Sequence, residues 1–154
     1  MLLYLVQHGE ATSEEQGKAR PLNDKGLSDV RKTAAFLSRL DTGVECIYHS
    51  GKLRALQTAR VLAETLKPRD GLKETDGLSP LDDPLLWVER IKDMSAAVML
   101  VGHLPHLAKL ASVLLFGQSD HNVIAFKMAG IVCLQTMAGK DWTLQWMVIP
   151  EICG

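Results

Sequence analysis

Short runs of five or six mostly apolar residues recur along the chain between longer polar stretches, at positions 2–6, 44–48 and 96–101. Runs of this length are typical of strands buried within a sheet. The first run leads into Gln7-His8-Gly9, and the third leads into Gly102-His103. We therefore predict three buried strands, two of which end at a glycine-bearing turn that contains a histidine.

Between these runs, apolar residues recur at steps of three and four, which is the spacing of one helix face. This pattern predicts a helix over residues 28–40, with Ser28 as its N-cap, and a second helix over residues 52–66, which Pro68 ends. A third helix is predicted from about Pro105 to Leu115, because proline is favoured at the first position of a helix.

Turn residues and local runs define the remaining segments. Residues 12–24 are polar and residues 67–84 are rich in Gly, Pro and Asp, so both are predicted to be loops, and a short amphipathic helix carrying Leu86 and Ile91 follows. Three strands are predicted near the C-terminus, the last two joined by a turn at 138–141: residues 123–128, 131–137 and 142–149.

Strands that alternate with helices predict an α/β fold, namely a three-layer α/β/α sandwich with a mostly parallel sheet and an antiparallel C-terminal hairpin. The length of 154 residues is near the common size of one domain, so a single domain over residues 1–154 is expected. In such sheets ligands bind beyond the carboxyl ends of the strands. His8 and His103 are both expected at that edge of the sheet.

Composition narrows the class of protein. A hydrophobic fraction of 47% and a charged fraction of 23% are ordinary for a globular protein. Lys and Arg number 17 against 18 Asp and Glu, without a long basic run, so nucleic acid is not an expected partner. No apolar stretch approaches the roughly 18 residues that cross a bilayer, and the first run lacks the basic start of a signal peptide. We therefore expect a cytoplasmic protein without a membrane partner, and the cysteines fit reduced thiols without a chemical role: Cys46, Cys133 and Cys153.

Four separated motifs carry a resemblance to a known family: residues 5–10 (LVQHGE), 20–22 (RPL), 50–58 (SGKLRALQT) and 101–105 (VGHLP). In this order and spacing they resemble the histidine phosphatase superfamily, and within it the short SixA-type phosphohistidine phosphatases. The resemblance extends from the first predicted strand through the helix after the last motif. It implies that the predicted sandwich is of the phosphoglycerate mutase-like kind.

The resemblance implies catalytic roles for four residues. His8 takes the phosphoryl group as a nucleophile, His103 contacts the phosphoryl oxygens, and the guanidinium groups of Arg20 and Arg54 bind them. An imidazole suits the first role because much of it is unprotonated at neutral pH, and the planar donors of arginine suit the oxygens. An ordinary surface charge is the alternative for either arginine.

Two positions depart from the family pattern. Gln7 stands where the family motif has arginine, which removes one positive charge from the expected pocket while leaving amide donors. Gly51 stands where the family often has proline. Lys52, at the start of its predicted helix, is the candidate to replace the missing charge. The residues expected to bind phosphate are therefore Gln7, Arg20, Lys52, Arg54 and His103.

Other polar residues have alternative interpretations. Three acids are candidates for the proton donor to the leaving group: Glu10, Asp82 and Asp83. For Glu10 the alternative is a role in holding its own loop, whereas two adjacent aspartates such as Asp82 and Asp83 are more typical of a solvated loop. His49 either lines the pocket or simply ends its strand. His103 and His106 have the spacing of a metal pair, but no further ligands occur at suitable spacing, so neither a metal nor another cofactor is expected.

The sequence thus predicts a metal-independent phosphatase that works through a phosphohistidine intermediate. The expected substrate is a phosphorylated protein, with phosphohistidine as its reactive group, or a small phosphomonoester. The alternative is a module that binds phosphate or phosphohistidine and is a weak catalyst because Gln7 replaces the arginine.

Overall fold

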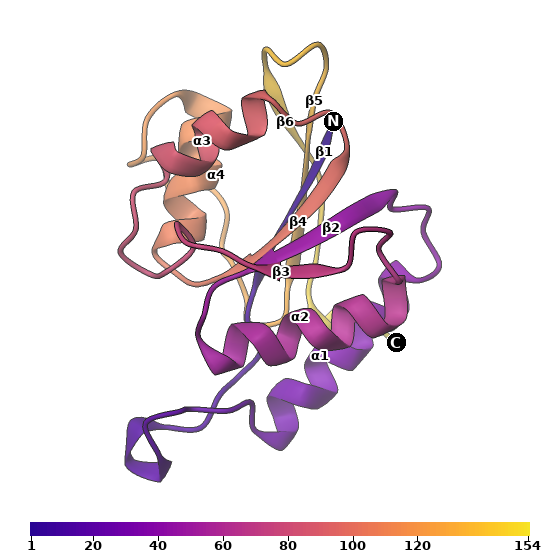
Figure 1. Ribbon diagram of the computed structural model, residues 1–154, viewed down its shortest axis with the longest axis vertical. Helices are drawn as coiled ribbons and strands as arrows, with labels where there is room; N and C mark the ends of the chain where they lie inside the picture. The colour runs from indigo at the N-terminus through magenta and orange to yellow at the C-terminus, as the bar shows by residue number, and fades with distance from the viewer.

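The computed structural model describes residues 1–154 and is built around one sheet of six strands in the order β3-β2-β4-β1-β5-β6 (Figure 1). The strands are β1 (Leu2–Gln7), β2 (Val44–His49), β3 (Leu72–Glu74), β4 (Ala97–Gly102), β5 (Ile131–Thr136) and β6 (Trp142–Val148). The four strands β3, β2, β4 and β1 run parallel, whereas β5 and β6 are antiparallel to their neighbours. The predicted mostly parallel sheet with an antiparallel C-terminal hairpin is confirmed.

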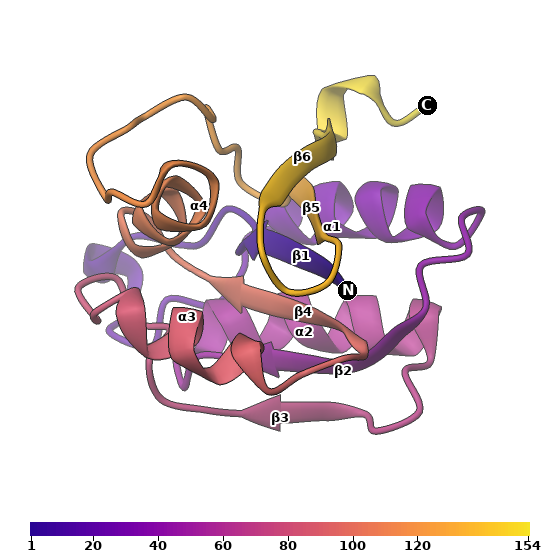
Figure 2. The same ribbon diagram turned by 90° about the horizontal axis from the view of Figure 1, so that it is seen from above.

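Helices cover both faces of this sheet, as the view from above shows (Figure 2). Buried residues of α1 (Asp24–Leu37) and α2 (Leu53–Leu66) pack with Tyr4 and Val6 on one face. Those of α3 (Leu85–Lys92) and α4 (His106–Phe116) pack with Leu3 and Leu5 on the other face. Because side chains alternate along a strand, β1 contributes to both layers of the core. The three-layer sandwich predicted from the sequence is confirmed, and no helix is both long and apolar enough to span a membrane.

The register of the parallel strands brings their carboxyl ends together. Gln7 at the end of β1 pairs with Gly102 at the end of β4, and His49 at the end of β2 pairs with Val101. The residue after β1, His8, donates its backbone N–H to the carbonyl of Gly102 over 3.1 Å. The turns after three central strands therefore meet at one edge of the sheet.

The first helix begins earlier than the apolar spacing indicates. α1 starts at Asp24, and its N-cap is Asn23, whose side chain accepts a hydrogen bond from the backbone N–H of Gly26 over 2.8 Å. The prediction of Ser28 as N-cap was wrong because the first turn is polar and carries no apolar period. Gly26 is needed in this turn, since a Cβ there would lie 2.0 Å from the carbonyl oxygen of Glu10.

Two strand predictions also need correction. Residues 123–128 form no strand, although Ile124 and Phe126 are buried: the segment crosses the α3/α4 layer without pairing to the sheet. Conversely, β3 lies inside the predicted loop 67–84, where it pairs with β2 at the edge of the sheet. Its three residues include two exposed charged side chains, so no apolar run marks it in the sequence.

Candidate functional site

The ring of His8 is fixed by its own backbone immediately after β1. Nδ1 lies 2.6 Å from the carbonyl oxygen of Gly9, and because a carbonyl only accepts, Nδ1 carries the hydrogen. Nε2 is then the unprotonated nitrogen, and the Nε–H of Arg54 donates to it over 3.4 Å. The arrangement leaves the Nε2 lone pair of a neutral imidazole beside a guanidinium group.

His103 lies directly opposite His8. It follows Gly102 at the end of β4, is 1% exposed, and its ring centroid is 4.9 Å from that of His8. Its Nε2 lies 2.6 Å from the hydroxyl oxygen of Ser50, a buried residue that follows β2. Histidines more than 90 residues apart in the sequence thus face each other because β1 and β4 are neighbours.

The two arginines named by the sequence approach the same histidine from different segments. Arg54 is the second residue of α2, so its side chain leans toward the N-terminal end of that helix. Arg20 lies in the loop before α1, where it adopts a positive φ of 48° and its Nε–H donates to the carbonyl of Thr12 over 3.0 Å. Arg54 donates to the His8 ring over 3.4 Å, and the charges of both arginines lower the pKa of His8.

Burial lowers the pKa of both histidines. Desolvation is the largest cause that lowers the pKa of His8. The hydrogen bond to the Gly9 carbonyl raises this pKa, whereas the positive charges of Arg54 and Arg20 lower it. Desolvation is also the largest cause that lowers the pKa of His103 to about 3, followed by the charges of His8 and Arg54. A negative phosphoryl group would offset the repulsion among these cations.

Thr58 links the His8 turn to the helix that carries Arg54. The backbone N–H of Gly9 donates to the Thr58 hydroxyl over 3.0 Å, and this hydroxyl donates to the carbonyl of Arg54 over 2.8 Å. Thr58 is fully buried. Ser50 and Thr58 both fall in the motif 50–58, but sequence reasoning about charge singled out only the cations in it.

Gln7 lies at the end of β1 with its side chain 7% exposed. Its backbone carbonyl accepts a hydrogen bond from Ala129 over 2.9 Å, whereas its side-chain Oε1 is buried and has no partner. Since β1 residues alternate between faces, the Gln7 side chain lies on the α4 side of the sheet with Leu3 and Leu5. Lys52 is exposed at the N-cap of α2, close enough for its charge to lower the pKa of His103.

The other candidates have local partners or none. The carboxylate of Asp82 accepts from the N–H of Ser79, and that of Asp83 accepts from the N–H of Leu85, so both stabilise their own loop. The backbone carbonyl of Glu10 accepts a hydrogen bond from the N–H of Asn23. Nδ1 of His49 lies 2.8 Å from the carbonyl oxygen of Ser50. No group of three or more His, Cys, Asp or Glu side chains is placed to hold a metal ion.

The sequence did not predict two further features, namely the position of Glu74 and the burial of His106. The carboxylate of Glu74, at the end of β3, lies where a Cβ on Gly51 would approach it to 2.5 Å, so it borders the turn after β2. His106, the first residue of α4, is completely buried, and neither of its ring nitrogens has a partner.

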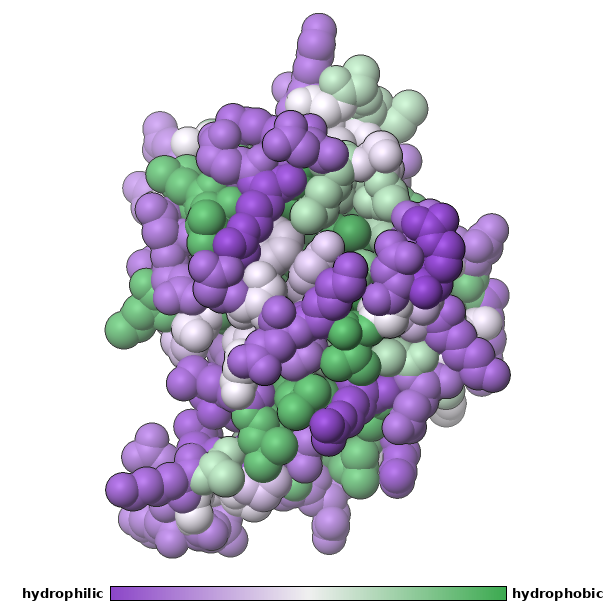
Figure 3. Space-filling model, in the orientation of Figure 1, coloured by the Kyte–Doolittle hydropathy of each residue, from purple (hydrophilic) through white to green (hydrophobic).

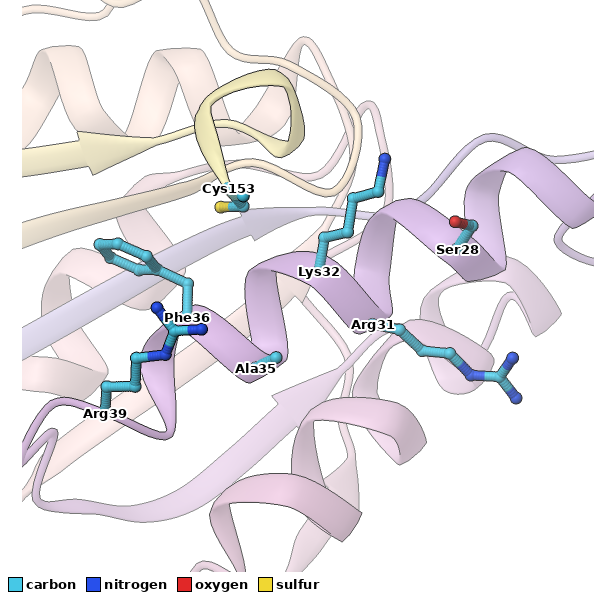
Figure 4. A pocket seen from close by; sticks show the side chains of 8 residues that line it. Ser28, Arg31, Lys32, Ala35, Phe36, Arg39 and Cys153 are labelled. Atoms are coloured by element: carbon cyan, nitrogen blue, oxygen red, sulfur yellow. The ribbon is translucent and has the colours of Figure 1, made fainter.

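A cavity of about 340 Å³ lies elsewhere, along the outer face of α1, and Figure 4 shows its side chains. Lys32 and Arg39 flank Phe36 there, and Cys153 from the C-terminal segment lies opposite. None of the residues around His8 lines this cavity. The paired histidines therefore define a separate site at the carboxyl edge of the sheet.

Comparison with known proteins places this geometry in a family. The model of the histidine phosphatase superfamily (branch 1) matches residues 3–79. An uncharacterised protein of Picosynechococcus sp. strain PCC 7002 is 37% identical over 149 residues, covering 91% of this chain and 88% of that protein. The phosphohistidine phosphatase SixA of Escherichia coli is 23% identical, with 97% of this chain and 94% of that protein covered.

The fold agrees with a solved member. The structure of the protein histidine phosphatase SixA complexed with tungstate superposes with a TM-score of 0.87 at 23% identity, covering 98% of each chain. The sandwich is therefore of the phosphoglycerate mutase-like kind that the sequence resemblance implied.

Proposed function

The chain belongs to the histidine phosphatase superfamily and is a phosphatase, and on this premise we propose that it removes phosphate from phosphohistidine on a protein through a phosphorylated His8. The observation that carries this proposal is the orientation of His8. Its Nδ1–H is bonded to the Gly9 carbonyl, so Nε2 is the unprotonated nitrogen, and the His8 ring lies opposite that of His103. The Nε2 lone pair accepts a hydrogen bond from Arg54 over 3.4 Å and is free to attack phosphorus once Arg54 donates to a phosphoryl oxygen instead. This is the geometry that a nitrogen nucleophile needs.

In the first step, the Nε2 lone pair of His8 attacks phosphorus, and the bond between phosphorus and the substrate nitrogen breaks. The phosphoryl group is then bonded to Nε2, while the substrate imidazole leaves with the bonding electron pair and takes up a proton. In the second step, a water oxygen attacks phosphorus and the bond to Nε2 breaks. The water loses a proton, inorganic phosphate leaves, and His8 recovers its lone pair.

Charge around His8 supports both steps. The guanidinium groups of Arg20 and Arg54 offer donors to the phosphoryl oxygens, on which negative charge is spread in the transition state. The ring of His103 lies on the opposite side, and Lys52 and the amide of Gln7 complete the proposed phosphate-binding set. No step requires a metal ion, because the cationic side chains supply the electrostatic stabilisation.

The choice of a protein substrate rests on similarity. The relative from Escherichia coli is named a phosphohistidine phosphatase, and the match extends over almost the full length of both chains. A phosphorylated imidazole is also a good leaving group once protonated, so the mechanism makes small demands on a dedicated acid. This suits a site where Asp82 and Asp83 are engaged in loop hydrogen bonds.

The test is turnover and trapping of the intermediate. We expect the protein to hydrolyse phosphoramidate and a phosphohistidine peptide, and brief incubation with the ³²P-labelled peptide should leave acid-labile label on the protein. His8→Asn should remove both turnover and label while the protein remains folded by circular dichroism. Activity should persist in EDTA.

Three results would contradict this function. Retained labelling in His8→Asn would exclude His8 as the nucleophile. Loss of activity in EDTA that a divalent ion restores would exclude the metal-independent mechanism. Tight binding of tungstate without any turnover would instead favour the binding module that Gln7 suggested.

A further inference from the structure

We propose that three exposed apolar side chains around the His8 pocket form a docking rim for the phosphorylated protein: Leu81, Leu104 and Met128. This inference rests on the proposed function, because it concerns the substrate of the same site. The occupant to which it commits is a folded protein that presents phosphohistidine from an apolar surface patch.

Each member of the rim is tied to the pocket by a neighbouring residue. Leu104 directly follows His103. Met128 precedes Ala129, whose backbone N–H lies within hydrogen-bonding distance of the carbonyls of Gln7 and His8, at 2.9 and 3.2 Å. Leu81 belongs to the loop between β3 and α3, where the carbonyl of Leu78 lies 3.2 Å from the position of a Cβ on Gly102. Three separate segments thus bring apolar side chains to one edge of the sheet.

The three side chains of the rim are exposed to solvent and are not part of the hydrophobic core. Leu81 is 87% exposed, Met128 is 45% exposed and Leu104 is 38% exposed. Green apolar atoms protrude at the left edge of Figure 3, where the loop before α3 lies in Figure 1. Single exposed apolar side chains are common, but three on segments next to His8 and His103 match the aliphatic surroundings of a protein interface.

The extent of the rim favours a protein over a small molecule. A phosphoryl group on Nε2 of His8 would lie beside the paired rings of His8 and His103, which are already in contact at a centroid distance of 4.9 Å. A side chain as exposed as Leu81 is buried only by a body that extends well beyond that phosphoryl group. A ligand that contacts both His8 and the rim is therefore larger than a small phosphomonoester.

The charged residues near the rim indicate what charge the surface of the partner carries. Asp82 and Asp83 follow Leu81 directly, and neither is in an ion pair with a basic residue. A partner surface with basic residues beside its apolar patch complements this acidic corner, whereas an anionic lipid surface is repelled by it. We therefore expect docking to weaken moderately as the salt concentration rises.

The experiment compares three substrates of increasing size in the full chain: phosphoramidate, free phosphohistidine, and a small folded protein phosphorylated on one histidine with phosphoramidate. Wild-type protein should show a higher kcat/KM for the phosphoprotein than for free phosphohistidine. Leu81→Ser and Met128→Ser should each reduce kcat/KM for the phosphoprotein about tenfold, chiefly by raising KM. Their kcat/KM for phosphoramidate should change less than twofold.

Met137→Ser and Leu144→Ser are matched controls, because these apolar residues are also exposed, at 73% and 47%, but lie in the β5–β6 hairpin. They should leave all three substrates unaffected. The rim is overturned if wild-type protein shows no preference for the phosphoprotein, if the controls lose as much as the rim variants, or if phosphoramidate turnover falls equally. Absence of turnover on every substrate would instead refute the proposed function.

Discussion

At the scale of single residues, position 7 shows how one neutral side chain changes the balance of charge in the site. Desolvation is the largest cause that lowers the pKa of Arg54, and the positive charge of Arg20 is the next. An arginine at position 7 would add a third cation to the proposed phosphate-binding set, where the charge of Glu14 only partly opposes the lowering of the pKa of Arg54. On the proposed function, a neutral Gln7 avoids this repulsion and makes a weaker hydrogen bond to the phosphoryl group than an arginine would.

We expect Gln7→Arg to tighten the binding of tungstate and to raise kcat/KM for phosphoramidate. A hydrogen bond to a charged group contributes about 1.5–3 kcal/mol, so the gain should be roughly tenfold or more. If Lys52 replaces the missing charge, Lys52→Ala should weaken tungstate binding more in the native background than after Gln7→Arg. Titration calorimetry on the four proteins measures this, and equal losses in both backgrounds would exclude compensation by Lys52.

At the scale of elements, the β1 turn and α2 are coupled through one buried hydroxyl. His8 depends on the Gly9 carbonyl for its orientation, Gly9 is held by Thr58, and Thr58 is bonded to the carbonyl of Arg54. The position of His8, the proposed nucleophile, relative to the Arg54 guanidinium therefore depends on the Thr58 side chain, which makes no hydrogen bond to the ring of His8 or to that guanidinium. Thr58 is a positioning residue.

Thr58→Val keeps the shape of the side chain but removes both hydrogen bonds, whereas Thr58→Ser keeps the hydroxyl. We expect Thr58→Val to lower kcat about 10- to 100-fold with little change in KM, and to lower the free energy of unfolding by roughly 1–3 kcal/mol. Thr58→Ser should retain most of kcat. Steady-state kinetics with phosphoramidate and urea unfolding provide the measurement. An equal loss of kcat in both variants would mean that packing of the methyl group, and not the hydroxyl, matters.

The elements also show what a sequence pattern can and cannot predict. The strands β1, β2 and β4 are buried, so continuous apolar runs mark them, and β2 and β4 each end within one residue of the prediction. The edge strand β3 depends on pairing with β2 and carries exposed charges, so no local pattern marks it. For residues 123–128 the apolar pattern predicted a strand that does not form. Their buried apolar side chains pack in the α3/α4 layer, and their backbone does not pair with the sheet.

The sequence names the candidate residues of the site through their motifs. It does not indicate the contacts that those residues make with segments far away in the sequence. His8, His103, Arg20 and Arg54 were named from motifs, and the structure places the rings of His8 and His103 4.9 Å apart with Arg54 hydrogen-bonded to His8. The catalytic roles of all four stay predictions. The hydrogen bond between Ser50 and His103 joins residues 53 positions apart, so no local spacing indicates it. The packing of Glu74 over Gly51 depends on the unpredicted strand β3.

At the scale of the whole molecule, three buried histidines make stability depend on pH. Desolvation lowers the pKa values of His8, His103 and His106 in the folded protein. In the unfolded chain a histidine takes up a proton below about pH 6.5. Between that pH and the lower folded pKa the unfolded state binds more protons, so the free energy of unfolding falls as the pH falls. The slope is at most about 1.4 kcal/mol per pH unit for each histidine.

His106 is the histidine whose contribution can be tested without touching the proposed mechanism. It is completely buried beside the α3/α4 layer of the core, and neither ring nitrogen has a hydrogen-bond partner. His106→Leu should remove an unsatisfied polar group and one of the three titrations. We expect the variant to be more stable than wild type by about 1–3 kcal/mol at pH 5, with a smaller gain at pH 8.

Urea unfolding from pH 5 to pH 8 should therefore give a shallower slope for His106→Leu than for wild type, while His8 and His103 maintain part of the dependence. His121→Gln is the matched control, because His121 is exposed in the folded protein and its replacement removes a histidine without changing the core. Its slope should equal that of wild type. A parallel loss of stability at every pH in His106→Leu would show that the ring is held by packing that leucine cannot reproduce, and an unchanged slope with unchanged stability would show that His106 does not titrate on unfolding.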